Sequence, residues 1–332
     1  LTLKDALSHR TGYGRNDTLW ANPEIPRKDI IRFAPLAKPL ARHKEEFHYN
    51  NVMYLAAGMA TAHDLGFDWN KLLKDKLLSP LGMNSTTTNH KNVINSGRMA
   101  NGYYFSDIEQ RYIRLEHEDR NNIAPATGVY SSASDMEKLL KFLLSGKNGR
   151  GESLIEQKTL SEIFKPTTTV SPTFNYGLGW YVSEYNGEKL LDHSGNGEGF
   201  SSTIALLPET NAGFVLLTNV SITPLQTASI NLIFDALTKD NLDEESEPLD
   251  IDYSKFVGEY LANFWQFQNV YFSFQMQGEK PAINIPGQTL YMLKPPDEEG
   301  KFYLEITNNV AISFNLDEQK NVVSMIHHES GQ

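Results

Sequence analysis

Hydrophobic residues recur at helical spacing in three stretches of the first half of the chain. The spacing predicts helices from residue 51 to about 64, from 69 to Pro80 and from 135 to Gly146, because apolar positions three and four apart form one buried face. Pro80 and Gly146 stand where such helices commonly end. This part of the chain is therefore expected to form an α-helical subdomain.

Polar residues that can cap helices precede several of these stretches. Thr2 and Asp5 form a capping box at the start of the chain, Asp68 stands before the second stretch, and Ser134 with Glu137 forms a capping box before the third. In a capping box the hydroxyl accepts a backbone N–H and the acidic side chain reaches back to another. These caps predict where the helices begin.

Beyond residue 175 the pattern becomes that of strands. Asn186-Gly187 separates two runs of strand-forming residues, which predicts a tight hairpin. The predicted strands cover residues 176–184, 189–193, 200–207 and 213–220, and a helix covers 224–238. These runs predict an α+β fold, in which an antiparallel sheet is flanked by helices.

A densely acidic stretch, residues 241–252, follows this part of the chain and indicates a linker. Beyond it, short β-type runs are separated by Gly, Pro, Asn and Asp, a pattern typical of a small antiparallel barrel or sandwich. We expect one domain at residues 1–240 and a second at 253–332.

Composition narrows the possible functions. Among 332 residues, 41 acidic side chains outnumber 30 Lys and Arg, and the net charge is -11, so a nucleic acid would be repelled. The chain has no cysteine, which excludes a thiol nucleophile and a Cys-ligated metal. No apolar run approaches the roughly 20 residues of a transmembrane span. His327-His328 lacks the H-x-x-x-H spacing of a metal hydrolase, and we expect no metal or other cofactor.

Tyr49 and Asn51 are the first candidate site residues, and they lie just ahead of a predicted helix. A tyrosine can act as general base if nearby cations lower its pKa, and an asparagine can hydrogen-bond a substrate amide. The alternative interpretation is that Asn51 caps the helix and Tyr49 packs in the core.

His193 begins the second candidate group, at the end of a predicted strand. Gly195, Asn196 and Gly197 follow it. Glycines would let a substrate approach the backbone closely, and backbone N–H groups there suit part of an oxyanion hole. The alternative is a glycine-rich loop beside a surface histidine.

Six short motifs occur in a fixed order along the chain. They are residues 7–12 (LSHRTG), 47–51 (FHYNN), 78–86 (LSPLGMNST), 128–136 (GVYSSASDM), 176–180 (YGLGW) and 193–195 (HSG). Together they resemble the motifs of the penicillin-recognising serine hydrolases, the group of class C β-lactamases, D-amino-acid peptidases and esterases. Several weak motifs in the right order are far more specific than any one of them.

The resemblance implies a β-lactamase/transpeptidase-like fold and an acyl-enzyme mechanism. The family uses a Ser-x-x-Lys, a Tyr-x-Asn and a Lys- or His-x-Gly. On this basis Tyr49 is the general base and acid, and Asn51 orients the substrate amide. His193 stands where the family's Lys or His tunes the site, with Gly195 beside the substrate. Asn196 supplies its backbone N–H to the oxyanion hole.

The first of these family motifs is absent. No serine in the chain has a lysine three residues later, and Ser134, with Lys138 four residues later, is interpreted as a helix cap. In relatives the Ser-x-x-Lys precedes the segment that resembles residues 7–12. We therefore expect the nucleophile upstream of Leu1 and expect this chain alone to be inactive. In relatives the nucleophile helix is central to the α-helical half, and the N-terminal strands join the sheet. A chain without both would leave apolar surface uncovered, which favours an oligomer or a separate N-terminal fragment as partner.

The resemblance also bears on substrate and location. His193 in place of Lys removes a charge that would bind a carboxylate, which favours esters, amides or D-amino-acid peptides over β-lactams. Residues 256–260 (FVGEY) resemble the opening of lipocalin-like domains appended to some family members. Relatives are commonly exported, which implies a periplasmic or secreted protein. The main alternative is a non-catalytic relative, in which the same fold serves as a binding or sensory module.

Overall fold

The computed structural model describes residues 1–106, 108–238, 251–264, 267–278, 280–285, 290–297, 299–305, 307–317 and 319–329. The chain divides into two compact units, Leu1–Gln226 and Thr227–Gln332. Most of the acidic stretch 241–252 lies outside the described residues. The linker and the domain limits expected from the sequence therefore stay predictions.

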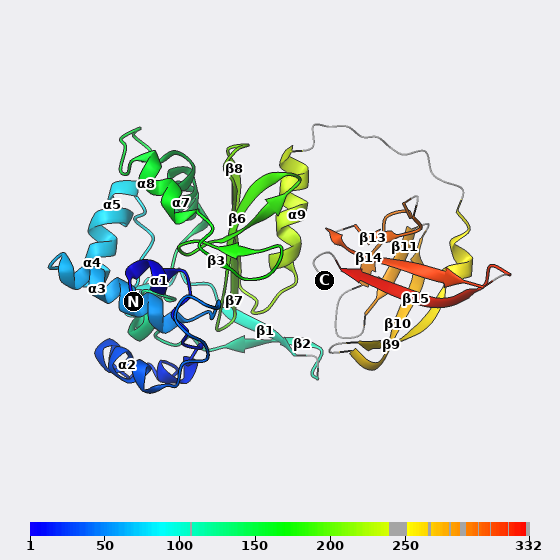
Figure 1. Cartoon of the computed structure of the whole chain (residues 1–332), viewed down its shortest axis with the longest axis horizontal. Coiled ribbons are helices and arrows are strands. Elements are labelled where there is room, and N and C mark those ends of the chain that lie inside the picture. Colours follow the sequence, from blue (N-terminus) through cyan, green and yellow to red (C-terminus); the bar gives the residue numbers. More distant parts are fainter. Residues whose placement is uncertain are drawn as a thin grey trace. The chain divides into compact units, whose positions relative to one another are not determined.

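The larger unit is built on a six-stranded antiparallel sheet in the order β3-β4-β5-β6-β7-β8 (Figure 1). Its strands are β3 (Thr168–Thr169), β4 (Asn175–Tyr176), β5 (Tyr181–Tyr185), β6 (Glu188–Gly197), β7 (Phe200–Leu207) and β8 (Ala212–Thr218). The hairpin of β5 and β6 turns at Asn186 and Gly187, with φ of 49° and 83°. These left-handed values are what such a tight turn requires. The predicted hairpin and antiparallel sheet are confirmed.

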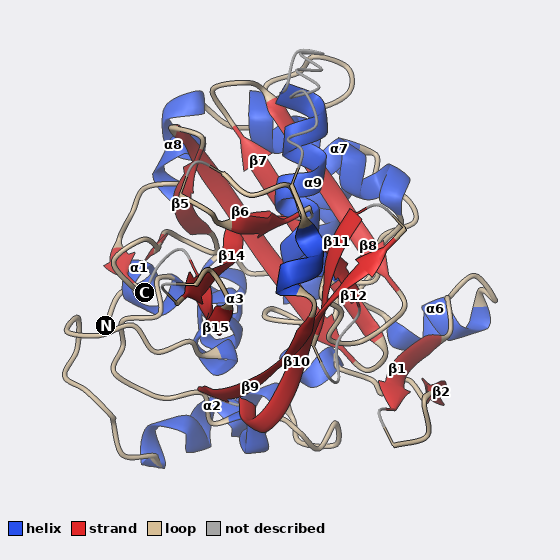
Figure 2. Ribbon diagram, turned by 90° about the vertical axis from the view of Figure 1, so that its right-hand side faces the viewer, coloured by secondary structure: helices blue, strands red, loops and turns tan. Residues whose placement is uncertain are grey.

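Helices accompany this sheet. They are α1 (Leu3–Leu7), α2 (Arg27–Phe33), α3 (Asn51–Asp64), α4 (Trp69–Leu73), α5 (Ser79–Leu81), α6 (His90–Asn95), α7 (Ala133–Ser145) and α8 (Gln157–Ile163). Helix α7 lies against the sheet (Figure 2), where Phe142 shares a buried cluster with Leu191 and Leu206. A second buried cluster joins α2 to α3 through Ile30 and Leu55. The helical part therefore has its own core beside the one that covers the sheet.

Two helix starts agree with the caps expected from the sequence. Thr2 and Asp5 form the predicted capping box of α1, and Asp68 accepts the backbone N–H groups of Asn70 and Lys71 at the start of α4. Both caps satisfy donors that the first helical turn leaves without partners.

Two helix limits differ from the prediction. The second helical run continues past Pro80 and ends at Gly82, because Pro80 stands in the first turn of α5, where its missing N–H is not needed. Helix α7 is capped by Ser132 rather than by Ser134. The carboxylate of Asp135 accepts hydrogen bonds from residues 85 and 86, which fixes the first turn of α7 to the neighbouring loop.

The sequence pattern does not predict the hairpin of β1 (Gly102–Ser106) and β2 (Arg111–Leu115). Most of its side chains are exposed or half-buried. No alternation of apolar and polar positions therefore marks these strands, because that alternation arises where one face of a sheet is buried.

The described residues of the smaller unit form two antiparallel sheets, after helix α9 (Leu225–Thr238), which spans the division between the units. One sheet has the order β12-β11-β10-β9 and the other β13-β14-β15. Their strands are β9 (Gly258–Phe264), β10 (Phe267–Gln277), β11 (Lys280–Asn284), β12 (Leu290–Met292), β13 (Phe302–Leu304), β14 (Thr307–Leu316) and β15 (Val322–Glu329).

The strands of the smaller unit surround a core that includes Phe272 and Phe302. An isolated bridge between Leu293 and Leu304 links the two sheets. No ladder pairs β9 with β15 among the described residues, so these strands do not close into the expected small barrel. Within the same residues, no helix has both the length and the apolar character needed to cross a bilayer.

Candidate active site

Tyr49 lies immediately ahead of α3, on a segment that the helix cap holds in place. Asn50 is the N-cap and accepts the N–H of Met53 at 3.1 Å. The guanidinium of Arg15 lies 5.2 Å from the centroid of the Tyr49 ring. Burial raises the pKa of Tyr49 and Tyr181 adds to the rise, whereas Arg15 opposes it. The phenol is therefore protonated at neutral pH.

His193 lies on β6, and both of its ring nitrogens have partners. Nδ1 lies 2.8 Å from the carbonyl oxygen of Ser194, and Nε2 lies 3.1 Å from the hydroxyl of Tyr176. A carbonyl oxygen can only accept, so Nδ1 carries the proton and Nε2 accepts from Tyr176 in the neutral ring. Burial lowers the pKa of His193, although the bond to Ser194 opposes this. The ring is thus neutral and fixed in orientation.

Tyr49 and His193 come together from separate parts of the fold. Their ring centroids lie 6.2 Å apart with an interplanar angle of 41°. Tyr181 stands beside both, with its ring centroid 5.7 Å from that of His193. The residue pair expected to carry the chemistry therefore shares one region at the junction of α3 and the sheet.

Asn51 is the first residue of α3 and not its cap, so the interpretation of Asn51 as the helix cap is wrong. Asn50 takes that role because its own backbone is extended, as a cap requires. The side chain of Asn51 is half-buried. Its amide has no hydrogen-bond partner within the described part of the chain, which leaves both its donor and its acceptor available.

Gly195 and Asn196 lie within β6, which continues to Gly197, and not in a glycine-rich loop. Asn196 Oδ1 accepts a hydrogen bond of 2.9 Å from Ser201, and the carbonyl of Gly195 accepts one of 3.0 Å from Gln226. Strand β6 pairs with β5 only as far as Asp192, whereas its pairing with β7 continues to the end of the strand. Residues 193–197 therefore form an open strand edge in the described structure.

Gly195 and Asn196 also line a cavity of about 1700 Å³, together with Tyr130 and Ser131. Tyr49, Asn51 and His193 are not among its lining residues. The predicted site is thus brought together in two adjoining parts. Tyr49 and His193 form a ring pair, and Gly195 and Asn196 connect it to an open cavity along β6.

Sequence reasoning missed His9 and Tyr176, which contact the predicted residues directly. Tyr176 is fully buried and hydrogen-bonds His193. The rings of His9 and Tyr49 lie 4.2 Å apart. Both residues belong to motifs quoted above, at 7–12 and 176–180, so the motifs marked their neighbourhood without indicating their role.

Comparison with known proteins decides the family. The sequence profile of the Beta-lactamase family matches residues 1–237. The chain belongs to the Beta-lactamase family. The motifs that resemble penicillin-recognising serine hydrolases all lie within this match.

The curated relatives that this chain matches are longer than the matched region. Protein flp of Staphylococcus aureus (strain MW2) is 31% identical over 232 residues, covering 67% of this chain and 43% of that protein. Unguisins hydrolase ungD' of Aspergillus campestris is 26% identical over 235 residues, covering 67% of this chain and 43% of the relative. The matched region thus spans less than half the length of these relatives.

Solved structures show the same Beta-lactamase-family fold. The octameric penicillin-binding protein homologue from Pyrococcus abyssi matches with a TM-score of 0.67 at 22% identity, over 96% of this chain and 75% of that one. D-amino acid amidase from Ochrobactrum anthropi SV3 matches with a TM-score of 0.59 at 21% identity, over 72% of each chain. Hydrolases therefore stand among both the sequence relatives and the structural neighbours of this member of the Beta-lactamase family.

Ser134 and Lys138 do not form a nucleophile pair in this Beta-lactamase-family chain. The ammonium of Lys138 donates to the carbonyl of Gly82 at 2.6 Å and to Asp135 at 2.8 Å. The hydroxyl of Ser134 lies 3.3 Å from that of Ser132. The ammonium of Lys138 thus already has partners at the start of α7 and at Gly82, and within the described residues it makes no hydrogen bond to a serine hydroxyl that it could activate.

Proposed function

We propose that this chain carries part of the active site of a serine hydrolase, which acts through an acyl-enzyme on a small ester, amide or D-amino-acid peptide. Tyr49, Asn51, His193, Gly195 and Asn196 are its site residues. The observation that carries the proposal is the approach of the Tyr49 and His193 rings to 6.2 Å, from the start of α3 and from β6.

The protonated phenol of Tyr49 suits proton delivery. When a serine Oγ attacks the substrate carbonyl carbon, the lysine of the proposed Ser-x-x-Lys takes the serine proton, and Tyr49 gives its own proton to the departing amine or alkoxide. A phenol whose pKa burial raises holds its proton until a stronger base forms on the leaving group. The positive charge of Arg15 limits this rise in the pKa of Tyr49, so the phenol can still give its proton to the leaving group. In the second step water attacks the acyl ester and gives a proton to the Tyr49 phenolate, while the lysine returns its proton to the serine Oγ as the acid is released.

Substrate binding is assigned to the open edge of β6 and to Asn51. An extended substrate can add its main chain to an unpaired strand edge, and the amide of Asn51 has its donor and acceptor available for the substrate. The backbone N–H of Asn196 is the proposed oxyanion donor. The name of one structural neighbour, D-amino acid amidase, favours amide substrates.

The nucleophilic serine and its lysine are proposed to lie on a segment outside these 332 residues, since the chain contains no Ser-x-x-Lys. The cavity beside Gly195 and Asn196 measures about 1700 Å³. Small-molecule sites usually measure about 300–1,000 Å³, so this cavity has room for a chain segment as well as a substrate. By itself this chain is then inactive.

The test compares the product of the full coding sequence with the 332-residue chain. Nitrocefin, p-nitrophenyl butyrate and D-Ala-p-nitroanilide serve as a β-lactam, an ester and an amide. We expect the full-length protein to turn over the ester or the amide faster than nitrocefin, and the 332-residue chain to turn over none. Fast turnover of nitrocefin alone would contradict the substrate assignment. A full coding sequence without Ser-x-x-Lys would favour the alternative, a non-catalytic binding or sensory relative.

Assembly is a separate proposal. The neighbour from Pyrococcus abyssi is described as octameric, and we propose that this protein also associates. The lipocalin-like assignment of residues 253–332 likewise remains a proposal. Light scattering of the full-length protein tests association, and a monomer at all concentrations would contradict it.

A further inference from the structure

His9 has an unusual backbone conformation for its residue type. Its φ is 55°, in the left-handed region that side chains other than glycine seldom occupy. Its side chain is 1% exposed. Such a conformation persists only where the surroundings impose it, and it often marks a functional position.

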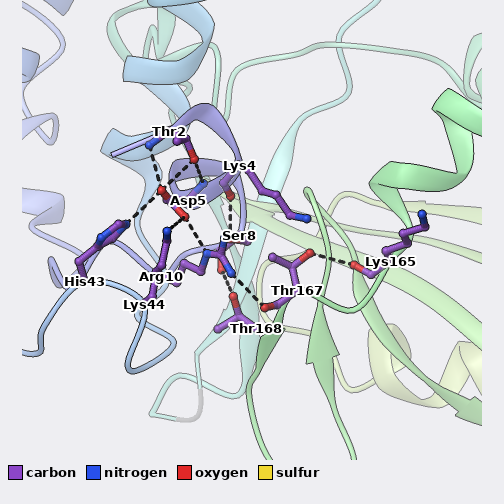
Figure 3. A network of polar contacts seen from close by, with 10 residues as sticks. All are labelled: Thr2, Lys4, Asp5, Ser8, Arg10, His43, Lys44, Lys165, Thr167 and Thr168. Atoms are coloured by element: carbon purple, nitrogen blue, oxygen red, sulfur yellow. Dashed lines mark hydrogen bonds and ion pairs between the residues drawn. The ribbon is translucent and has the colours of Figure 1, made fainter.

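The surroundings of His9 are held by a network centred on the buried carboxylate of Asp5 (Figure 3). Asp5 accepts hydrogen bonds from Thr2, from Arg10 Nε at 2.8 Å and from His43 Nε2 at 3.0 Å. It thereby joins the start of α1, the residue after His9 and the loop that leads to Tyr49. The backbone before and after His9 is fixed from two sides.

Further bonds hold the flanking backbone. The carbonyl of Ser8 accepts the hydroxyl of Thr168 on β3 at 2.8 Å, as Figure 3 shows. The carbonyl of His9 itself accepts the N–H of His48 at 2.8 Å. The strained residue is therefore attached both to the sheet and to the segment that carries Tyr49.

The imidazole of His9 makes one hydrogen bond, and this bond fixes its tautomer. Nδ1 accepts the backbone N–H of Asn50 at 3.1 Å, so the proton of the neutral ring is on Nε2. Nε2 is buried and has no partner within the described residues. Burying the Nε2 donor without a partner costs stability. The acceptor at Nδ1 and the contacts of the ring must therefore offset this cost at position 9.

The ring of His9 contacts three tyrosines around the Tyr49–His193 pair. Its centroid lies 4.2 Å from that of Tyr49, 5.0 Å from that of Tyr54 and 4.8 Å from that of Tyr176. Tyr176 in turn hydrogen-bonds His193. His9 thus contacts the phenol on one side and the residue that orients the imidazole of His193 on the other.

We propose that His9 is a positioning residue of the active site, which acts through Tyr49. Its Nδ1 anchors the backbone of the residue that follows Tyr49, and its ring supports the phenol, so that the phenol stays opposite His193. This inference rests on the proposed function for the meaning of Tyr49. Its physical content, that His9 holds the phenol in place, is testable on this chain without any catalysis.

The test uses two substitutions of His9 that differ in where they place a polar atom. His9→Asn keeps an acceptor near the Nδ1 position and tolerates the left-handed backbone. His9→Gln places its amide near the Nε2 position and removes the acceptor for Asn50. His63→Asn, at an exposed histidine of α3, is the control for changing a histidine.

The readout is nitration of tyrosines by tetranitromethane, located by peptide mass mapping on the 332-residue chain. Tyr112, whose side chain is 59% exposed, is the internal standard, and fully buried Tyr176 reports general unfolding. In His9→Gln we expect Tyr49 nitration relative to Tyr112 to rise about fivefold, the shift that corresponds to one lost hydrogen bond. Tyr176 should stay unmodified, and His9→Asn and His63→Asn should resemble the unsubstituted chain.

Equal Tyr49 nitration in His9→Gln and the unsubstituted chain would overturn the proposal. A parallel rise at Tyr49 and Tyr176 would also overturn it, because His9 would then support the fold in general. Neither result depends on hydrolysis. Absence of activity in the full-length protein would instead contradict the proposed function and leave the positioning role intact.

Discussion

The hydroxyl of Tyr176 lies 3.1 Å from Nε2 of His193, and this contact joins the end of β4 to the strand that carries the candidate imidazole. Since Nδ1 of His193 donates to Ser194, Tyr176 supplies the proton in this hydrogen bond. The imidazole is therefore held by a donor on one side and an acceptor on the other.

Tyr176→Phe removes that donor from His193. A hydrogen bond accepted by a neutral imidazole stabilises the neutral form, so we expect the pKa of His193 to rise toward its ordinary value. The free energy of unfolding should fall by about 1 kcal/mol. NMR titration of the His193 ring measures the pKa, and urea unfolding measures the free energy of unfolding. Tyr181→Phe, which leaves the bond in place, is the matched control, and an equal shift of the pKa in both variants would contradict the assignment.

Tyr49→Phe in the full-length protein tests the proton-transfer role. Loss of the phenol oxygen should lower kcat by about 10²–10⁴-fold and change KM little, because the ring that packs on His9 remains. Tyr13→Phe, on the segment before α2, serves as the control and should retain activity. Full activity in Tyr49→Phe would remove Tyr49 from the mechanism.

Asp5→Asn tests the network that holds His9. Burial disfavours the charged carboxylate, but hydrogen bonds from Thr2, His43 and Arg10 outweigh this and hold the pKa of Asp5 well below its usual range. Removing one partner of a buried ion pair costs about 3–5 kcal/mol, and we expect that loss at pH 7 in urea unfolding. A carboxyl whose pKa is lowered by folding stabilises the fold at every pH above its pKa in the unfolded chain, which is near 4. The difference in unfolding free energy between Asp5→Asn and the unsubstituted chain should therefore shrink only below about pH 4.

Asp17→Asn is the control for this prediction. Asp17 pairs with Arg15 at the same N–O distance of 2.8 Å, but that ion pair is exposed. Exposed pairs contribute about 0–1 kcal/mol. A loss in Asp5→Asn no larger than in Asp17→Asn would show that the network does not stabilise the α1 region.

Asp192→Asn should make the chain more stable at high pH. Burial raises the pKa of Asp192 to about 6, so the folded state holds a proton that the unfolded state releases near pH 4. Stability is then lost as the pH rises from about 4 to 6 and stays lower above that. We expect Asp192→Asn to gain roughly 3 kcal/mol at pH 8 and almost nothing at pH 4. Glu184→Gln, at an exposed position of β5, should show no such dependence.

Much of the larger unit could be predicted because local patterns and tertiary structure agree there. The turn at Asn186 and Gly187 and the helix at residues 51–64 carry their own conformational signals. The local pattern does not decide the N-cap of α7, because Ser132 and Ser134 both stand three residues before an acidic side chain. The contact of Asp135 with residues 85 and 86, about 50 positions away, accompanies the cap at Ser132. Contacts of that range leave no local pattern.

The same distinction applies to the candidate site. The motifs identified Tyr49 and His193, since each has a recognisable sequence neighbourhood. They could not show that His9 packs against Tyr49 and Tyr176, because a histidine buried among tyrosines has no periodicity of its own. Its left-handed backbone also follows from tertiary bonds rather than from the residue type.

The strand edge at residues 193–197 carries a risk as well as a proposed role. Any sheet edge with unpaired main-chain groups can recruit strands from other molecules and seed aggregation. Here the edge reads His-Ser-Gly-Asn-Gly, short and without a β-branched or aliphatic side chain, so it is a poor template for a foreign strand. The edge at residues 193–197 can thus stay accessible to a substrate without pairing readily with the strands of other protein molecules.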